Sequence, residues 1–254
     1  MVKPSVVFFD IGSTLWSSPA EDPGALRDCY TRGREALLRA STEVPPIEAL
    51  IDAVEHYFAE WEDIWRVEPE KVQQPPTTEY VATALRKLNL APPPQALAAF
   101  TSELLEVSVG TARALPPEAG MKEALAELRG LGVRLACVSN AFMGAATLDR
   151  ILEERGLDEH LEFTVSSCDF GWRKPHASIY QEALRLAGAT AEEAVFVGDR
   201  LDADVEGPAT VGMRTVLTLQ YRREDPSKAP VKPDAVIDHL SELPGVIGSM
   251  LQDD

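Results

Sequence analysis

A short apolar run near the start of the sequence, Val6 to Phe9, ends directly on a carboxylate, Asp10. A charged group at the end of a buried strand is costly unless it is partnered or takes part in chemistry, so Asp10 is the first candidate functional residue. Further polar residues follow this run and two other apolar runs: Gly12, Ser13 and Thr14; Ser139 and Asn140; Asp199, Asp202 and Asp204. Arg173 and Lys174 directly precede a predicted helix. If these runs are parallel strands, we expect the polar residues to meet at one edge of the sheet.

The candidate residues combine acids, a hydroxyl and a lysine, and this combination suits phosphoryl transfer. A carboxylate such as Asp10 can attack phosphorus and form an aspartyl-phosphate. Mg²⁺ takes oxygen ligands, typically one or two carboxylates with substrate oxygens and water, and would neutralise both the acids and the phosphate. Lys174 and the Ser139 hydroxyl would then face the other phosphoryl oxygens. We therefore expect a small phosphate ester as substrate, with Thr14, Ser139, Asn140 and Lys174 as its contacts.

The elements that must position these residues alternate between apolar strands and amphipathic helices. The predicted strands after the first are VRLACVSN, EFTVSS, AVFVGD, RTVLTL and DAVIDHL, and the predicted helices are MKEALAELRGLG, MGAATLDRILEERG and HASIYQEALRLAG. Strands that are apolar on both faces are typical of a parallel sheet covered by helices on both sides. The sequence therefore predicts an α/β fold.

Residues from about 25 to 109 interrupt this alternation, because they show only helical periodicity. We predict an all-α insertion between the first strand and the rest of the sheet. An aromatic set in this segment, Tyr57, Phe58, Trp61 and Trp65, has helical spacing and is expected to form the core of the insertion. The pattern leaves open whether Trp16 and Phe142 face a substrate.

Four short segments occur in a fixed order along the chain: DIGSTL, VSN, RKP followed by IY, and GDRLDAD. Together they resemble the four ordered motifs of the haloacid dehalogenase-like hydrolase superfamily. The resemblance implies a Rossmann-like core with a helical cap inserted after the first strand. We therefore predict a hydrolase core at residues 1–18 and 111–254, and a cap at residues 19–110.

The resemblance also implies roles for individual residues. Asp10 would be the nucleophile, and Ser139 and Lys174 would contact the phosphoryl group. Asp204 matches the second acid of the last motif, whereas Asp202 either joins the metal site or simply favours a helix N-terminus. The implied metal ligands are Asp10, the Gly12 carbonyl, Asp199 and Asp204.

The second position after the nucleophile departs from the pattern of the phosphatases in this superfamily, which usually have a second aspartate there. Gly12 has no side chain to protonate the leaving group, and the loss of such general acid-base catalysis typically costs about 10²–10⁴-fold in rate. We therefore expect faster hydrolysis of aryl or acyl phosphates than of sugar phosphates, because a stable leaving group needs less protonation.

Three alternatives remain open because of Gly12. The 2-haloacid dehalogenases also lack the second aspartate, but their last motif lacks the acidic pair present here as Asp199 and Asp204. Phosphonate hydrolases use a cap lysine as a Schiff base, for which only Lys71 and Lys87 are available in the insertion. A non-catalytic protein that binds a phosphate, a metal or a protein partner would explain the glycine but not the other intact residues.

The composition argues against a nucleic-acid-binding protein, a membrane-spanning protein and a disulfide-rich protein. The net charge is −17, from 41 acidic and 24 basic residues, and no basic cluster stands out, which argues against nucleic acid as a partner. No segment is long and apolar enough to predict a membrane span. The cysteines, Cys29, Cys137 and Cys168, show neither a disulfide nor a zinc pattern, so we expect a cytoplasmic protein. The oligomeric state stays open.

Overall fold

A parallel six-stranded sheet forms the centre of the computed structural model, which describes residues 2–17, 22–41, 43–67, 73–114 and 119–252. The predicted α/β fold is confirmed, and each predicted strand is present. The strands are β1 (Val6–Phe9), β2 (Arg134–Ser139), β3 (Thr164–Ser166), β4 (Ala194–Gly198), β5 (Arg214–Thr218) and β6 (Ala235–Ile237). Their order in the sheet is β3-β2-β1-β4-β5-β6, with every pair parallel.

The strand order places β1 between β2 and β4. From β1 the chain continues to β2 and β3 on one side, then returns to the other side of β1 with β4. The carboxyl ends of β1, β2 and β4 therefore meet where the strand order reverses, and ligands of open α/β sheets bind at such a point.

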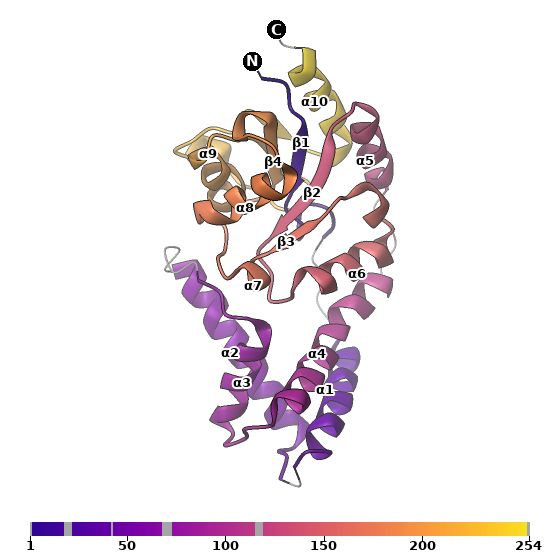
Figure 1. The fold of residues 1–254 in the computed structure, drawn as a ribbon, viewed down its shortest axis with the longest axis vertical. Coiled ribbons are helices and arrows are strands. Elements are labelled where there is room, and N and C mark those ends of the chain that lie inside the picture. Colours follow the sequence, from indigo (N-terminus) through magenta and orange to yellow (C-terminus); the bar gives the residue numbers. More distant parts are fainter. Residues whose placement is uncertain (1, 18–21, 42, 68–72, 115–118, 253–254) are drawn as a thin grey trace.

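Helices cover both faces of the sheet (Figure 1). The strands alternate their side chains between these faces, because successive residues of a strand point to opposite sides. Val7 and Phe9 pack with α5 and α6, whereas Val6 and Phe8 pack with α8. The covering helices are α5 (Met121–Gly130), α6 (Ala145–Arg155), α7 (Ser167–Phe170), α8 (Ala177–Ala187), α9 (Gly207–Thr210) and α10 (Leu243–Gln252).

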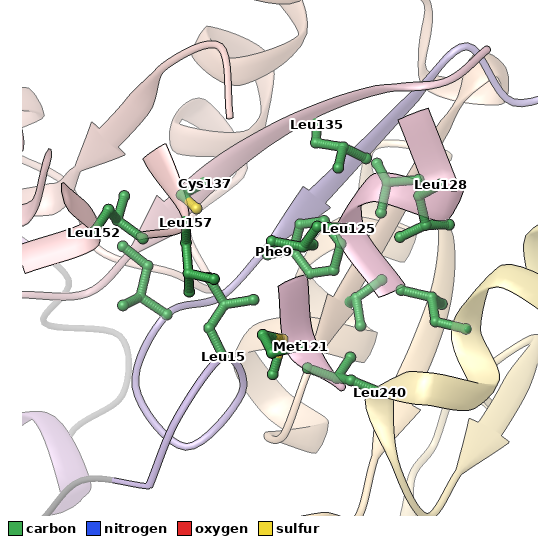
Figure 2. Close-up of a cluster of buried hydrophobic side chains, with 14 of the residues drawn as sticks. Phe9, Leu15, Met121, Leu125, Leu128, Leu135, Cys137, Leu152, Leu157 and Leu240 are labelled. Carbon is green, nitrogen blue, oxygen red and sulfur yellow. The ribbon is translucent and has the colours of Figure 1, made fainter. Parts of the chain in front are cut away.

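The larger of the two sheet-covering cores lies on the face that carries α5 and α6. Figure 2 shows Phe9 and Leu135 from neighbouring strands beside Leu125 and Leu128 of α5. All four side chains are fully or almost fully buried. Because fully burying such side chains contributes roughly 1.5–3 kcal/mol each, this core fixes β1 against β2 and holds the end of β1 in place.

A separate module of four helices lies beyond the carboxyl ends of the strands (Figure 1). Its helices, α1 (Pro23–Leu38), α2 (Ile47–Val67), α3 (Thr77–Lys87) and α4 (Pro94–Ala114), share an apolar core of their own. The predicted boundaries at residues 18 and 110 stay a prediction, and α4 continues past the second of them. No helix in the described ranges is long and apolar enough to cross a membrane.

The aromatic set predicted from the sequence lies at the junction of the helical module and the sheet. Phe58 and Trp65 pack around Tyr80 of α3, with ring centroids 5.9 Å and 6.2 Å from that of Tyr80. Phe142, which follows β2, inserts its ring 4.5 Å from that of Phe58 and 5.3 Å from that of Trp65. Tyr57 and Phe58 are partly buried against the module's core, whereas the set as a whole is only partly buried and, through Phe142, contacts the segment that follows β2.

The three cysteines, Cys29, Cys137 and Cys168, are free and buried. They form no disulfide with one another. The cytoplasmic location that we inferred from them stays a prediction.

Candidate active site

Asp10 occupies the position directly after β1, at the point where the strand order reverses. Its backbone N–H donates to the carbonyl of Val197 in β4 at 2.9 Å, so the sheet ladder continues through this residue. The chain then turns tightly, with the Ser13 N–H bonded to the Trp16 carbonyl at 2.9 Å. Asp10 is 8% exposed. The turn leaves the carboxylate at the floor of a cavity.

Lys174 lies against Asp10 and is buried. Its ammonium group donates to Asp10 Oδ1 at 2.7 Å and to Asp204 Oδ1 at 2.8 Å. Burial alone would lower the pKa of Lys174, but the two carboxylates more than offset this effect and raise it above its usual value. The amide of Asn140 holds the Lys174 backbone at both ends, at 2.9 Å and 2.8 Å. The structure thus brings Asp10 and Lys174 together, as predicted.

Asp204 is fully buried in the π-helical segment η3 (Leu201–Glu206) that follows β4. Its Oδ2 accepts the backbone N–H groups of Asp199 and Arg200 at 3.1 Å and 3.0 Å. Burial raises the pKa of Asp204 to about 7; Lys174 opposes this rise, and the neighbouring carboxylates add to it. A Cβ on Gly198 would clash with the Asp204 carboxyl, which explains the glycine at the end of β4.

The carboxylates of Asp10, Asp199 and Asp204 form a cluster, with one oxygen of each within 4.8 Å of the others. The Thr14 hydroxyl lies 3.5 Å from Asp10 Oδ2 and 3.5 Å from Asp199 Oδ1. Burial, together with the charge of Asp10, raises the pKa of Asp199. Three buried carboxylates this close repel one another, and oxygen donors alone suit a hard cation such as Mg²⁺. The donor set therefore fits a divalent cation between Asp10 and Asp199.

Arg222, which sequence reasoning missed, closes one side of the cluster. It comes from the polar loop after β5, and its Nε donates to Asp199 Oδ2 at 2.6 Å. Asp202, by contrast, lies outside the cluster and forms a bidentate pair with Arg200 at 3.0 Å and 2.7 Å. No local pattern could have identified Arg222, because its loop has no periodicity and meets Asp199 only in the folded chain.

A cavity of about 450 Å³ opens above the cluster and lies between the sheet and the helical module. Asp10, Gly12, Ser139 and Lys174 line its floor on the sheet side. The predicted substrate contacts Thr14 and Asn140 differ in placement: Asn140 lines the cavity, whereas Thr14 is fully buried beneath it. The other residues that line it include Trp16, Glu62, Ser108, Thr111, Met143, Leu148, Arg173 and Arg200. Asp10 therefore faces a space in which a small molecule could bind.

The helical module contacts the sheet close to Lys174. Gln73 and Gln74, which precede α3, lie beside the chain just before Lys174, with the Gln74 N–H bonded to the Gly171 carbonyl at 2.9 Å. Gln74 also accepts hydrogen bonds from Ser167 at 2.6 Å and from Arg173 at 2.8 Å. Thr77 donates to the carbonyl of Phe142. These cross-domain contacts gave no signal in the sequence, since each is made by a single polar residue.

Of the two lysines considered for Schiff-base chemistry, the structure describes Lys87 but not Lys71. Lys87 lies on the module's surface, where it pairs with Glu60 at 2.9 Å and covers the ring of Tyr57. It does not line the cavity above Asp10. Lys71 lies outside the described residues.

Comparison with known proteins gives consistent matches. Residues 4–212 match the sequence model of the haloacid dehalogenase-like hydrolase family. The human haloacid dehalogenase-like hydrolase domain-containing protein 3 is 41% identical over 107 residues, which cover 42% of this chain and 41% of that protein. The glyceraldehyde 3-phosphate phosphatase of Methanopyrus kandleri is 27% identical over 257 residues and aligns over 100% of both chains. The 2-haloacid dehalogenase from Pseudomonas syringae pv. Tomato DC3000 has a similar fold, with a TM-score of 0.64, 23% identity and coverage of 98% and 99%.

Proposed function

Because the chain belongs to the haloacid dehalogenase-like hydrolase family, we propose that it hydrolyses small phosphate monoesters through an aspartyl-phosphate at Asp10. The observation that carries the proposal is the buried pair between Asp10 and Lys174, 2.7 Å apart, at the floor of the cavity. The relative that aligns over its whole length is named as a phosphatase, which supports the same reaction class.

The first step is an in-line displacement at phosphorus. An Asp10 oxygen bonds to phosphorus while the bond to the leaving oxygen breaks, and the leaving oxygen departs with the bonding electrons. Lys174 holds Asp10 in place and contributes positive charge where the phosphoryl oxygens gather charge in the transition state. The Ser139 hydroxyl, which lines the cavity, would donate to the same oxygens. In the second step, a water oxygen bonds to phosphorus while the bond between phosphorus and the Asp10 oxygen breaks, which restores the Asp10 carboxylate and releases inorganic phosphate. The proton that the attacking water loses passes to solvent or to the phosphate.

The carboxylate cluster supports Mg²⁺ as the cofactor. Asp10, Asp199 and the Gly12 carbonyl would hold it, and it would supply charge neutralisation for the acids and the phosphate. The role of Asp204 as a metal ligand stays a prediction. Both of its carboxylate oxygens already accept hydrogen bonds, one from Lys174 and the other from backbone N–H groups. Arg222 neutralises part of the negative charge of Asp199 by donating to its Oδ2.

The helical module would act as the cap that was predicted from the sequence. It covers the cavity with residues such as Glu62, Ser108 and Thr111, so a substrate bound at Asp10 would be shielded from water. The acidic composition of the chain, in which no basic cluster stands out along the sequence, keeps a small molecule, rather than nucleic acid, as the expected partner.

The test is steady-state hydrolysis of 4-nitrophenyl phosphate with Mg²⁺ and with EDTA. We expect metal-dependent turnover that Asp10→Asn lowers by about 10⁴-fold or more, as is usual for the loss of a nucleophile. The matched control is Asp202→Asn, which removes a nearby carboxylate outside the cluster and should retain activity within about threefold.

Other outcomes would point elsewhere. Equal activity in wild type and Asp10→Asn would refute the aspartyl-phosphate. An inactive wild type that releases chloride from 2-chloropropionate would favour dehalogenation. An inactive wild type that releases neither product would leave a binding role.

A further inference from the structure

Arg173 differs from the other cations that line the cavity above Asp10. Lys174 pairs with Asp10 and Asp204, Arg222 pairs with Asp199, and Arg200 pairs with a carboxylate of its own segment. Within the described part of the chain, Arg173 has no carboxylate at ion-pair distance. Among the described residues, its positive charge is therefore the one in the cavity wall that no direct ion pair neutralises.

The guanidinium of Arg173 is nevertheless fixed in place. Arg173 is 9% exposed, its Nη1 donates to Gln74 Oε1 at 2.8 Å, and its Cζ lies 3.6 Å from the ring centroid of Trp65. Burial lowers the pKa of Arg173 to about 10, and the more distant Glu62 offsets this only in part. The remaining N–H groups of the guanidinium have no hydrogen-bond partner in the described ranges. A buried cation with free donors is a ready receptor for an anion.

The position of Arg173 relative to Asp10 indicates which part of a substrate it would meet. In-line displacement puts the leaving group opposite the nucleophile, and because Asp10 lies at the sheet edge, the leaving group points toward the helical module. Arg173 is attached to that module through Gln74 and Trp65. It also borders a second cavity of about 170 Å³, which Trp65 and Arg66 of the module help to line and Asp10 does not.

We propose that Arg173 binds an anionic group on the leaving portion of the substrate, a carboxylate or a second phosphate, and thereby selects phosphate monoesters whose leaving group is charged. This inference rests on the proposed phosphatase function and adds a substrate class to it. The contacts of Arg173 with Gln74 and Trp65 mean that the receptor is complete only while the helical module lies against the sheet.

The test compares carboxymethyl phosphate with carbamoylmethyl phosphate, which are similar in shape but differ in the charge of the leaving group. Both are alkyl esters, so the absence of an acid at Gly12 affects them alike. We expect wild type to prefer the charged ester by about ten- to hundredfold in kcat/KM, the range of a hydrogen bond between charged groups. The bisphosphate of ethylene glycol shows whether the receptor takes phosphate as well as carboxylate.

Three variants isolate the receptor. Arg173→Met removes the charge but keeps a long stem on Trp65, and should reduce the preference to near unity while changing kcat/KM for the neutral ester less than about threefold. Arg173→Lys should retain part of the preference and serves if the methionine variant fails to fold. The control Arg86→Met removes an exposed arginine of α3 that bonds to Thr83 and lines neither cavity, and should leave the preference intact.

Several results would overturn the proposal. A similar loss on both esters would show that Arg173 acts on the phosphoryl group or on folding, and a wild type without preference would exclude the receptor. Binding of the same esters to Asp10→Asn, measured by calorimetry, gives the comparison without turnover. An inactive wild type whose Asp10→Asn form still binds the charged ester more tightly would refute the proposed reaction but retain the receptor, whereas equal affinities would refute the receptor.

Discussion

The substitution Gly12→Asp tests directly what the glycine does in this site. Gly12 is half-buried, lines the cavity and lies two residues after Asp10. An aspartate there would stand beside the leaving group, where it can donate a proton and later accept one from water. General acid-base catalysis contributes about 10²–10⁴-fold, so we expect a gain of this size in kcat/KM for alkyl phosphates. Aryl phosphates, whose leaving groups are stable anions, should gain less than about tenfold.

The same substitution carries an electrostatic cost that the structure makes large. It adds a carboxylate about 7 Å along the chain from Asp10, in a cluster that already holds three. Two unit charges at this distance repel by about 2 kcal/mol at the effective dielectric of a protein site. We therefore expect Gly12→Asp to unfold at a lower temperature without Mg²⁺ and to recover most of this loss when Mg²⁺ is added.

The assay is kcat/KM across a series of phosphate esters, plotted against the pKa of the leaving alcohol or phenol, with thermal unfolding measured in parallel. Gly12→Asn is the matched control, because it has nearly the same shape but cannot act as an acid. An equal gain on aryl and alkyl esters, or the same gain with Gly12→Asn, would refute the reasoning. So would a folded, Mg²⁺-binding Gly12→Asp enzyme with no gain on alkyl esters.

Two further substitutions test the supports of the cluster. Arg222→Ala removes the cation that is bonded to Asp199 and should tighten Mg²⁺ binding, measured by calorimetry. The expected change is only about two- to fivefold, because Arg222 is half exposed and solvent weakens its interaction with Asp199. Arg223→Ala, a control on the surface of the same loop, should leave Mg²⁺ binding unchanged. Gly198→Ala would push a methyl group into the hydrogen-bonded carboxyl of Asp204 and should lower the free energy of unfolding, measured in urea, by about 1–3 kcal/mol. Gly130→Ala is the control, because its added carbon meets open space and should leave the free energy of unfolding unchanged. Equal effects at the two glycines would contradict the packing argument.

The sequence was a good guide to the sheet because its signals are local. Apolar runs such as Val6 to Phe9 indicate a strand that is buried on both faces of the sheet. A polar residue that follows such a run marks the edge of the sheet where ligands bind. Asp10 and Asp199 come together for this reason, although they are far apart along the chain, and Lys174 reaches them from the segment just before α8. The helical insertion was predictable for the same reason, because its period differs from that of the strands.

The parts of the site that the sequence did not predict are made by single residues in irregular segments. Gln74 reaches Arg173 from a loop between two helices of the module, and Arg222 reaches Asp199 from the loop after β5. Neither loop has a periodicity that could reveal which way its side chains point. Phe142 was left undecided for a related reason, because a ring that follows β2 can face either a ligand or a neighbouring domain. Its contacts with the rings of Phe58 in α2 and Tyr80 in α3 show that it faces the helical module.

The charges of the cavity reverse the balance of the chain as a whole. The protein has 41 acidic and 24 basic residues, so its overall field repels a phosphate dianion. The described residues that line the main cavity nevertheless include four basic and three acidic side chains, and the acids Asp10 and Asp199 are each bonded to a cation. A divalent cation at the cluster would add to the excess, and Arg173 is the cavity cation that has no direct ion pair among the described residues. We therefore expect the acidic chain to repel polyanions, while the cavity between the sheet and the module admits a small anion that fits.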